Sequence, residues 1–263
     1  MKTVILCGGR GTRIRDVTED LPKPMIPLGR LPILWHVMKT YAHWGHTDFI
    51  LCLGYKAEAV TDFFLNYHTR TSDFTLTLGA EPSVELHAPA DEAGWRITMA
   101  QTGLNALTGS RVKRVERYIA SGEDFLLGYG DGVSDIDLDA LVAFHREHGK
   151  VMTVTGVRPP GRFGELEADG DGLVTEFNEK PQAGGGLISG GYFVCKRELF
   201  DYLDPGREDQ MLEQEPMRAI VRDGEMAVYR HEGFWQCMDT RRDYELLSGY
   251  LERGEAPWVK WPT

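Results

Sequence analysis

Apolar residues in the first part of the chain alternate between strand-like runs and helix-like spacing. Continuous apolar runs of strand length cover residues 3–7 and 49–53. After each run, apolar residues recur three or four positions apart, which places them on one face of a helix. These residues are Ile33, Leu34, Val37, Met38, Tyr41 and Ala42, and then Ala57, Val60, Phe63, Phe64 and Tyr67. The order of strand, helix, strand and helix predicts a parallel sheet covered by helices.

Further strands and helices are predicted along the rest of the chain, with β-rich insertions between them. Strands are expected at residues 74–78, 96–100, 125–129, 151–157 and 192–195. Helices are expected at residues 110–119 and 211–221, after Asp137, and near the C-terminus, and a hairpin turn near 169–172. No repeat, linker or block of like charge marks a boundary within residues 1–263. We therefore predict one domain of the α/β class, with a Rossmann-like, mixed and mainly parallel sheet, flanking helices and small β insertions.

A glycine loop at the end of the first strand is the main candidate for chemistry. Gly8, Gly9 and Gly11 allow backbone N–H groups to turn toward an anion, because no Cβ keeps the anion away. Arg13 adds positive charge, and Lys23 stands between two prolines, whose φ angles are restricted. A triphosphate fits such a loop, although a glycine-rich turn after a core strand would contain the same glycines.

The loop differs from the two most familiar phosphate-binding motifs. The dinucleotide fingerprint needs a third glycine after Gly11 and an acidic residue about 20 positions further on. Asp16, Glu19 and Asp20 come too early for that acidic residue. Lys23 lies too far from the glycines for a Walker-type loop. A Rossmann oxidoreductase is therefore disfavoured.

Composition and charge narrow the choice of partners. The chain has 42% hydrophobic and 26% charged residues, as ordinary globular proteins do, and a net charge of −11. This charge argues against non-specific binding of nucleic acid or anionic membranes, so a local basic pocket must meet a substrate phosphate. No apolar run has the length of a membrane span, and we expect no signal peptide. The dispersed cysteines Cys7, Cys52, Cys195 and Cys237 predict reduced core thiols and a cytoplasmic protein.

Two further features of the predicted helices raise the question of a ligand. Arg111 stands near the N-terminus of a predicted helix, where its charge opposes the helix dipole without a local partner, which suggests a ligand. His145 and His148 share one helix face, but no third ligand is near in sequence. We interpret these histidines as surface residues.

Several short motifs follow one another in an order that resembles one enzyme family. They are Gly8-Gly9-x-Gly11-Thr12-Arg13, Pro22-Lys23-Pro24, Gly130-Asp131-Gly132, Glu179-Lys180-Pro181, Gly190-Gly191 and Trp235-x-x-x-Asp239. In this order, and over essentially the whole chain, they resemble the sugar-1-phosphate nucleotidyltransferases. Local runs at 32–36, 130–133, 159–164, 233–236, 238–240 and 256–258 are similar to the branch that uses CTP and glucose 1-phosphate. That branch provides CDP-glucose for deoxysugars of surface polysaccharides such as the lipopolysaccharide O-antigen.

The resemblance implies a reaction and the residues that perform it. A sugar 1-phosphate oxygen attacks the α-phosphorus of the triphosphate and pyrophosphate leaves. The nucleophile is already ionised at neutral pH, since the second pKa of a phosphate monoester is about 6, so no general base is required. By resemblance, residues 1–130 form the nucleotide-binding part and residues 131–263 the sugar-phosphate-binding part.

Site residues are assigned by the same resemblance, residue by residue. The catalytic set is Arg13, Lys23, Asp131, Lys180 and Asp239, and Asp131 and Asp239 hold Mg²⁺. The nucleotide site comprises Leu6, Cys7, Gly8, Gly9, Arg10, Gly11, Thr12, Arg13, Lys23, Arg111 and Gly130. The sugar-phosphate site comprises Tyr129, Glu179, Lys180, Ser189, Gly190, Gly191 and Trp235. Relatives of this branch form trimers or hexamers, so a homo-oligomer is expected.

Some alternatives stay open at this point. Ser189 stands where relatives of this branch carry Asn, and its shorter hydroxyl leaves the sugar undecided. Thymidylyl and uridylyl relatives share most of these motifs, so dTTP or UTP could replace CTP. A regulatory subunit without catalysis could keep the fold, although Lys23, Asp131 and Lys180 are all present.

Overall fold

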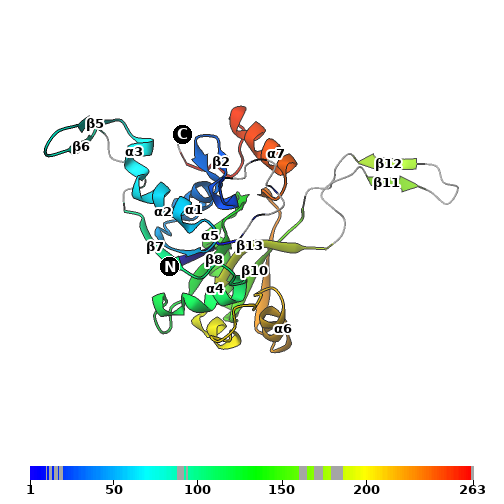
Figure 1. Cartoon of the computed structure of the whole chain (residues 1–263). Coiled ribbons are helices and arrows are strands. Elements are labelled where there is room, and N and C mark those ends of the chain that lie inside the picture. Colours follow the sequence, from blue (N-terminus) through cyan, green and yellow to red (C-terminus); the bar gives the residue numbers. More distant parts are fainter. Residues whose placement is uncertain are drawn as a thin grey trace.

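The centre of the protein is a seven-stranded sheet with the strand order β14-β10-β13-β8-β1-β4-β7 (Figure 1). This computed structural model describes residues 1–9, 11, 14, 17, 20–87, 92, 94–159, 165–168, 174–178 and 186–261. β1 pairs in parallel with β4 and β8, whereas β13 runs antiparallel to β8 and β10. The predicted mixed, mainly parallel sheet is therefore confirmed. Its strands are β1 (Lys2–Leu6), β4 (Asp48–Leu53), β7 (Arg96–Gln101), β8 (Phe125–Tyr129), β10 (Met152–Val157), β13 (Ile188–Cys195) and β14 (Met226–His231).

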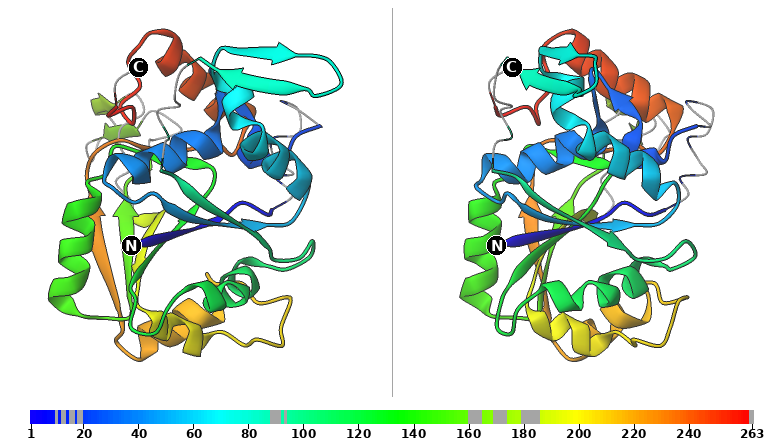
Figure 2. Two further views of the ribbon diagram at one scale, coloured as in Figure 1. Left: turned by 90° about the vertical axis from the view of Figure 1, so that its left-hand side faces the viewer. Right: turned by 60° about the vertical axis from the view of Figure 1, so that its left-hand side comes forward.

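Helices cover both faces of this sheet (Figure 2). On β1, Ile5 packs on one face, and Val4 and Leu6 pack on the other, because successive strand residues point to opposite faces. The first face meets α1 (Ile33–His43), α2 (Ala57–Leu65), α3 (Tyr67–Thr71), α5 (Leu138–His148) and α7 (Arg241–Glu252). The second face meets α4 (Thr108–Arg114), η4 (Arg197–Tyr202) and α6 (Glu215–Arg222). Burial on both faces explains why the central strands are continuous apolar runs rather than alternating ones.

Local signals set the ends of several helices. α1 begins directly after Pro32, whose φ of −67° and ψ of 153° are extended-chain geometry. α5 is capped by Asp137, whose Oδ1 accepts a hydrogen bond from the N–H of Ala140 at 2.8 Å. α7 begins with a capping box in which Thr240 and Asp243 accept each other's backbone N–H groups. The predicted cap at Asp137 is thus confirmed.

Small two-stranded sheets lie outside the main one, as the predicted β insertions required (Figure 1). They are β2 (Pro27–Leu28) with β3 (Leu31–Pro32), β5 (Phe74–Thr77) with β6 (Ser83–Leu86), β9 (Gly132–Ser134) with β15 (Trp235–Cys237), and β11 (Glu165–Ala168) with β12 (Val174–Asn178). β2, β3, β6, β9, β14 and β15 were not predicted. The predicted helix at 110–119 is split into α4 and the short helix η3 (Glu116–Tyr118). The predicted turn at 169–172 lies outside the described residues.

The prediction of surface histidines is wrong for His145. This residue is fully buried, and its Nδ1 lies 2.7 Å from Thr153 Oγ1. His148 Nε2 lies 2.8 Å from the same hydroxyl. β10 passes beneath this face of α5, a tertiary contact that the helical spacing does not reveal. Burial lowers the pKa of His145 to about 4.

The structure also shows the state of the four cysteines and the length of the described helices. Cys7, Cys52 and Cys195 are buried and free, so they are core thiols as predicted. Cys237 is free and half-buried. Within the described ranges, no helix is long and apolar enough to cross a bilayer.

Candidate active site

The strand topology brings three chain segments to one edge of the sheet. β1 and β8 are parallel, and their last residues, Leu6 and Tyr129, are direct register partners. β13 is antiparallel to β8, so its first half, with Gly190 and Gly191, lies at the edge where β8 ends. Carboxyl ends of parallel strands are where α/β sheets bind ligands. The glycine loop, the Gly-Asp-Gly turn and the Gly-Gly pair therefore meet although they are far apart in sequence.

A cavity of about 380 Å³ opens at this edge, and we call it the nucleotide cavity. It is lined by eight residues of the predicted nucleotide site, by both predicted metal ligands, and by five residues that sequence reasoning missed. The eight are Leu6, Cys7, Gly8, Gly9, Gly11, Lys23, Arg111 and Gly130. The five are Pro24, Ala106, Leu107, Thr108 and Met211. Pro24 belongs to the Pro22-Lys23-Pro24 motif but was not assigned to the site. The other four are loop or helix-start residues without a motif, so no local signal could have identified them.

A second cavity of about 210 Å³ adjoins the first, and we call it the sugar cavity. Its wall contains all the described members of the predicted sugar-phosphate site, namely Tyr129, Ser189, Gly190, Gly191 and Trp235. The indole Nε1–H of Trp235 donates to the carbonyl of Gly190 at 2.7 Å. The two cavities share Tyr129, Asp131 and Asp239. Two substrates bound here would therefore meet at the paired carboxylates.

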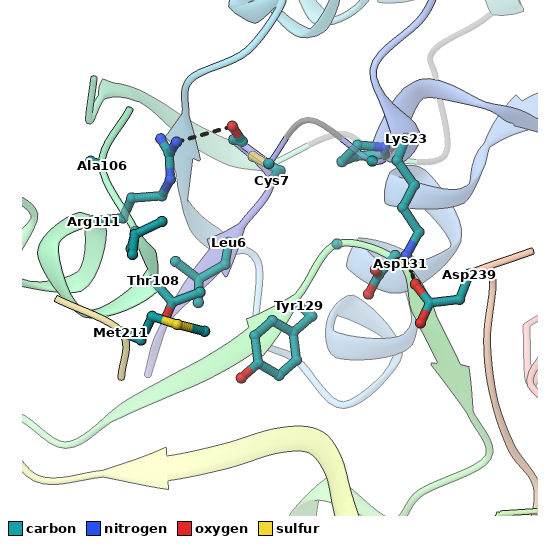
Figure 3. Close-up of a pocket in the computed structure, with 16 residues that line it drawn as sticks. Leu6, Cys7, Lys23, Ala106, Thr108, Arg111, Tyr129, Asp131, Met211 and Asp239 are labelled. Carbon is teal, nitrogen blue, oxygen red and sulfur yellow. Dashed lines mark hydrogen bonds and ion pairs between the residues drawn. The ribbon is translucent and has the colours of Figure 1, made fainter. Parts of the chain in front are cut away.

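The paired carboxylates converge on one cation of the protein itself. The Lys23 ammonium donates to Oδ2 of Asp131 and to Oδ1 of Asp239 (Figure 3). Burial alone would lower the pKa of Lys23, but the two carboxylates outweigh it and raise that pKa. Asp131 follows β8 and Asp239 follows β15. The pairing of β9 with β15 brings these two segments together, and the N–H of Met238 donates to the carbonyl of Asp131 at 2.8 Å.

This geometry fits a divalent cation. Mg²⁺ prefers oxygen ligands and is usually held by one or two carboxylates together with phosphate oxygens and water. Asp131 and Asp239 already aim one oxygen each at a single positive charge, that of Lys23. Among the described residues no third carboxylate, histidine or cysteine joins them, which leaves the other positions to substrate and water.

Comparison with known proteins identifies the family. The model of the nucleotidyl transferase family matches residues 2–245. The chain belongs to this family. It is 45% identical over 261 residues to the glucose-1-phosphate cytidylyltransferase of Salmonella typhi, covering 99% of this chain and 100% of that protein. It is 41% identical over 261 residues to the protein named "Probable glucose-1-phosphate cytidylyltransferase" of Bacillus subtilis, with the same coverage.

Solved structures support the fold of this nucleotidyl transferase. The crystal structure of HddC from Yersinia pseudotuberculosis matches with a TM-score of 0.67 and 20% identity, over 95% of this chain and 99% of that one. HddC complexed with GMP-PN matches with a TM-score of 0.66 over the same shares. At this identity the likeness bears on the fold alone. It confirms the predicted nucleotidyltransferase architecture.

Arg111 lines the nucleotide cavity of this nucleotidyl transferase, but its guanidinium differs from the expectation. It is only 4% exposed, and it finds partners in the protein. Its Nη1 donates to the carbonyls of Leu53 at 3.0 Å and Gly103 at 2.8 Å, and its Nη2 donates to that of Gly8 at 3.0 Å. The expectation that its charge lacks a local partner is therefore wrong. Burial lowers the pKa of Arg111, and the residue ties three strand-end loops together beside the nucleotide cavity. Its contact with a nucleotide stays a prediction.

The glycines of the loop are required by this packing. A Cβ at Gly8 would collide with the Arg111 guanidinium. Gly11 has a φ of +55°, and a Cβ there would lie 2.6 Å from the Cβ of Lys23. Both positions therefore need glycine for close approach of protein groups, in addition to any role toward phosphate.

Five predicted site residues cannot be placed. Arg10, Thr12, Arg13, Glu179 and Lys180 lie outside the described residues, so their roles stay predictions. The predicted division of the chain at residue 130 also stays a prediction. The nucleotide cavity does receive Met211 and Asp239 from the second part.

Proposed function

We propose that this nucleotidyl transferase moves a cytidylyl group from CTP to α-D-glucose 1-phosphate, giving CDP-glucose and pyrophosphate. The observation that carries the proposal is the pair of adjoining cavities whose common wall contains Asp131 and Asp239. The choice of CTP and glucose rests on the 45% and 41% identity to proteins named for that activity. Both relatives are matched over their full length.

The residues around the nucleotide cavity suit charge neutralisation rather than acid–base chemistry. Backbone N–H groups of Gly8, Gly9 and Gly11 can face a triphosphate, and Lys23 and Arg13 supply positive charge. The sugar phosphate is already ionised, so catalysis consists of aligning its oxygen with the α-phosphorus and stabilising the charge on the phosphates. Burial of the thiol raises the pKa of Cys7 to about 12, which excludes a thiolate nucleophile at neutral pH.

Asp131 and Asp239 would hold Mg²⁺. When bound, the ion neutralises phosphate charge and orients the oxygens that it touches. Hydrogen bonds fix the backbone from which the two carboxylates project, and the carbonyl of Asp131 accepts from the N–H of Met238. The N–H of Asp239 donates to Asp243 Oδ2 at 3.1 Å, within the capping box of α7. Such outer contacts orient metal ligands.

On the sugar side, we assign Tyr129, Ser189, Gly190, Gly191 and Trp235 to contacts with the hexose. Lys180 is assigned to the sugar phosphate and Glu179 to a sugar hydroxyl. We further propose that the enzyme is a cytoplasmic homo-oligomer that provides CDP-glucose for deoxysugars of surface polysaccharides. The exposed apolar face of the β5–β6 hairpin supports the oligomer.

A substrate panel tests the proposal. Pyrophosphate release is measured with CTP, UTP, dTTP and GTP against glucose 1-phosphate and its epimers, with Mg²⁺ present. CTP with glucose 1-phosphate is expected to give the highest kcat/KM. A higher kcat/KM with UTP or dTTP would show that the enzyme prefers that nucleotide to CTP. No turnover with any pair would favour a regulatory subunit.

Asp131→Asn provides the matched negative control. The loss is expected to be about 100-fold or more, because even outer-shell changes at metal sites cost about 10–100-fold. Asp139→Asn, at an exposed position of α5, should keep wild-type activity. Near wild-type turnover of folded Asp131→Asn would contradict the assignment of the metal site.

A further inference from the structure

The chain between η4 and α6 lies along the start of α4, where it forms part of the nucleotide cavity. The N–H of Leu107 donates to the carbonyl of Glu208 at 2.9 Å. The N–H of Leu212 donates to Thr108 Oγ1 at 2.9 Å. Met211, from the same segment, lines the cavity beside Thr108 (Figure 3). Hydrogen bonds therefore hold this segment, from residues 131–263, against the part of the cavity wall that residues 1–130 form.

Glu213 follows Leu212, and both of its carboxylate oxygens accept hydrogen bonds from side chains that line the cavity. Oε1 accepts a hydrogen bond from the Tyr129 hydroxyl. Oε2 accepts one from Thr108 Oγ1 at 2.5 Å. Burial, together with the Glu213 charge, raises the pKa of Tyr129, so its hydroxyl remains a neutral donor. Hydrogen bonds to an ionised acceptor are about twice as strong as neutral ones.

Tyr129 lies in the wall that the two cavities share. Its ring packs edge-to-face on Phe193, with ring centroids 5.9 Å apart. On another side it lies against Gly191, where a Cβ would be 2.5 Å from the ring atom Cδ2. These contacts hold the ring, and the bond to Glu213 holds the hydroxyl at its far end.

We propose that Glu213 is a positioning residue that keeps Tyr129 in place between the two substrates. The sugar phosphate must present its oxygen to the α-phosphorus in line, and small misplacements cost much of the rate. A Tyr129 ring that loses its anchor can turn away from Gly191 and change the shape of the sugar cavity. Nucleotide binding depends less on this ring, because the nucleotide cavity has many other walls.

The test is a double-mutant cycle with Tyr129→Phe. The pair of substrates is whichever gives the highest wild-type kcat/KM, so an error in the proposed function does not affect the cycle. Glu213→Ala should raise KM for the sugar phosphate and lower kcat/KM about tenfold, as the loss of one such bond does. KM for the nucleotide should change less than threefold. In the Tyr129→Phe background, Glu213→Ala should add less than a further twofold.

Two variants guard against a purely structural effect. Glu213→Gln keeps an oxygen that accepts from Tyr129, so it should recover most of the activity. Glu208→Ala removes a charge from the same segment, where Glu208 pairs with Arg114 at 2.7 Å, and should leave both KM values unchanged. Two results would overturn the proposal. In the first, the losses of kcat/KM in Glu213→Ala and Tyr129→Phe multiply fully in the double variant. In the second, the loss in Glu213→Ala is confined to KM for the nucleotide. Losses that multiply would mean that Glu213 acts independently of Tyr129. A loss confined to nucleotide KM would mean that Glu213 acts on the nucleotide side.

Discussion

At the scale of single residues, Lys23 has the most consequential position in the site. Its ammonium lies between Asp131 and Asp239, where the proposed Mg²⁺ has its protein ligands. Two carboxylates that close to each other repel unless a positive charge lies between them. We therefore expect Lys23 to stabilise, in the ligand-free protein, the arrangement that a metal ion would need, and to compete with that ion.

Replacing Lys23 should separate these two effects. Lys23→Met removes the competing charge, so Mn²⁺ should bind the ligand-free protein at least about tenfold more tightly, a difference of about 1.4 kcal/mol. Use of the triphosphate should fall at the same time. Mn²⁺ binding is followed by electron paramagnetic resonance without any substrate. Lys2→Met, which removes a lysine paired with Glu123 elsewhere, is the control. Unchanged or weaker Mn²⁺ binding in Lys23→Met would contradict the competition.

Ser189 is the residue at which the sugar preference is open. Its side chain is exposed at the sugar cavity, and its Oγ accepts a long bond of 3.4 Å from the N–H of Gly191. One neutral hydrogen bond is worth about 0.5–1.5 kcal/mol, so Ser189→Asn should change the ratio of kcat/KM between glucose 1-phosphate and its epimers by about tenfold or less. Ser121→Asn, at an exposed turn, should change nothing. A wild-type preference of more than tenfold for another sugar would reject glucose, and an unchanged ratio in Ser189→Asn would show that Ser189 does not select.

At the scale of elements, the β5–β6 hairpin is unusual. Phe74 pairs with Leu86, and Leu76 pairs with Val84, so these side chains share one face. Leu78 continues that face and is 81% exposed, and the four paired residues are exposed as well. An isolated two-stranded hairpin is marginally stable in water and needs a covered face. Because the chain carries a net charge of −11, this uncharged face suits a second copy, which would repel at charged surfaces.

A charge on the apolar face should therefore separate the copies. Leu76→Lys is expected to lower the molar mass in solution, measured by light scattering after size exclusion, while the far-UV spectrum is kept. Thr77→Lys places the same charge on the opposite face of the hairpin and should keep the wild-type mass. If wild type is already monomeric at every concentration, or if Leu76→Lys keeps the wild-type mass, the hairpin is not the contact between copies.

At the scale of the whole molecule, two buried histidines couple stability to pH. Burial lowers the pKa of His36 and of His145 to about 4 each. In the unfolded chain both titrate near pH 6.5. Below that pH the unfolded state binds protons that the folded state does not, so stability is lost as pH falls from about 6.5 toward 4. In this range each residue lowers the free energy of unfolding by about 1.4 kcal/mol for each pH unit.

Urea unfolding at pH 7.5 and pH 5.5 measures this coupling. The free energy of unfolding should fall by at least about 2–3 kcal/mol between the two values, the sum for His36 and His145, because burial also lowers the pKa of His46 and of His148. His36→Gln should remove about 1.4 kcal/mol of this difference, whereas His43→Gln, at an exposed position of α1, should keep all of it. An equal difference in wild type and His36→Gln would show that other groups cause the pH dependence.

The sequence by itself determined most strands of the main sheet, most helices and the candidate residues of the site. The run before Gly8, the spacing after Pro32 and the cap at Asp137 are local signals. Backbone sterics and the burial of one helix face act within a few residues, so they can be recognised without the fold. The order of the motifs was enough to predict the family.

Only the tertiary structure decided how these residues meet. Lys23 bridges Asp131 and Asp239, which stand 108 residues apart, because β9 pairs with β15. The partners of Arg111 are carbonyls at three strand ends, and the hydroxyl partners of Glu213 lie in other elements. Such contacts depend on which strands become neighbours, and a carbonyl or hydroxyl has no sequence signature. Local patterns therefore predicted the elements and the chemistry, whereas long-range pairing determined the geometry.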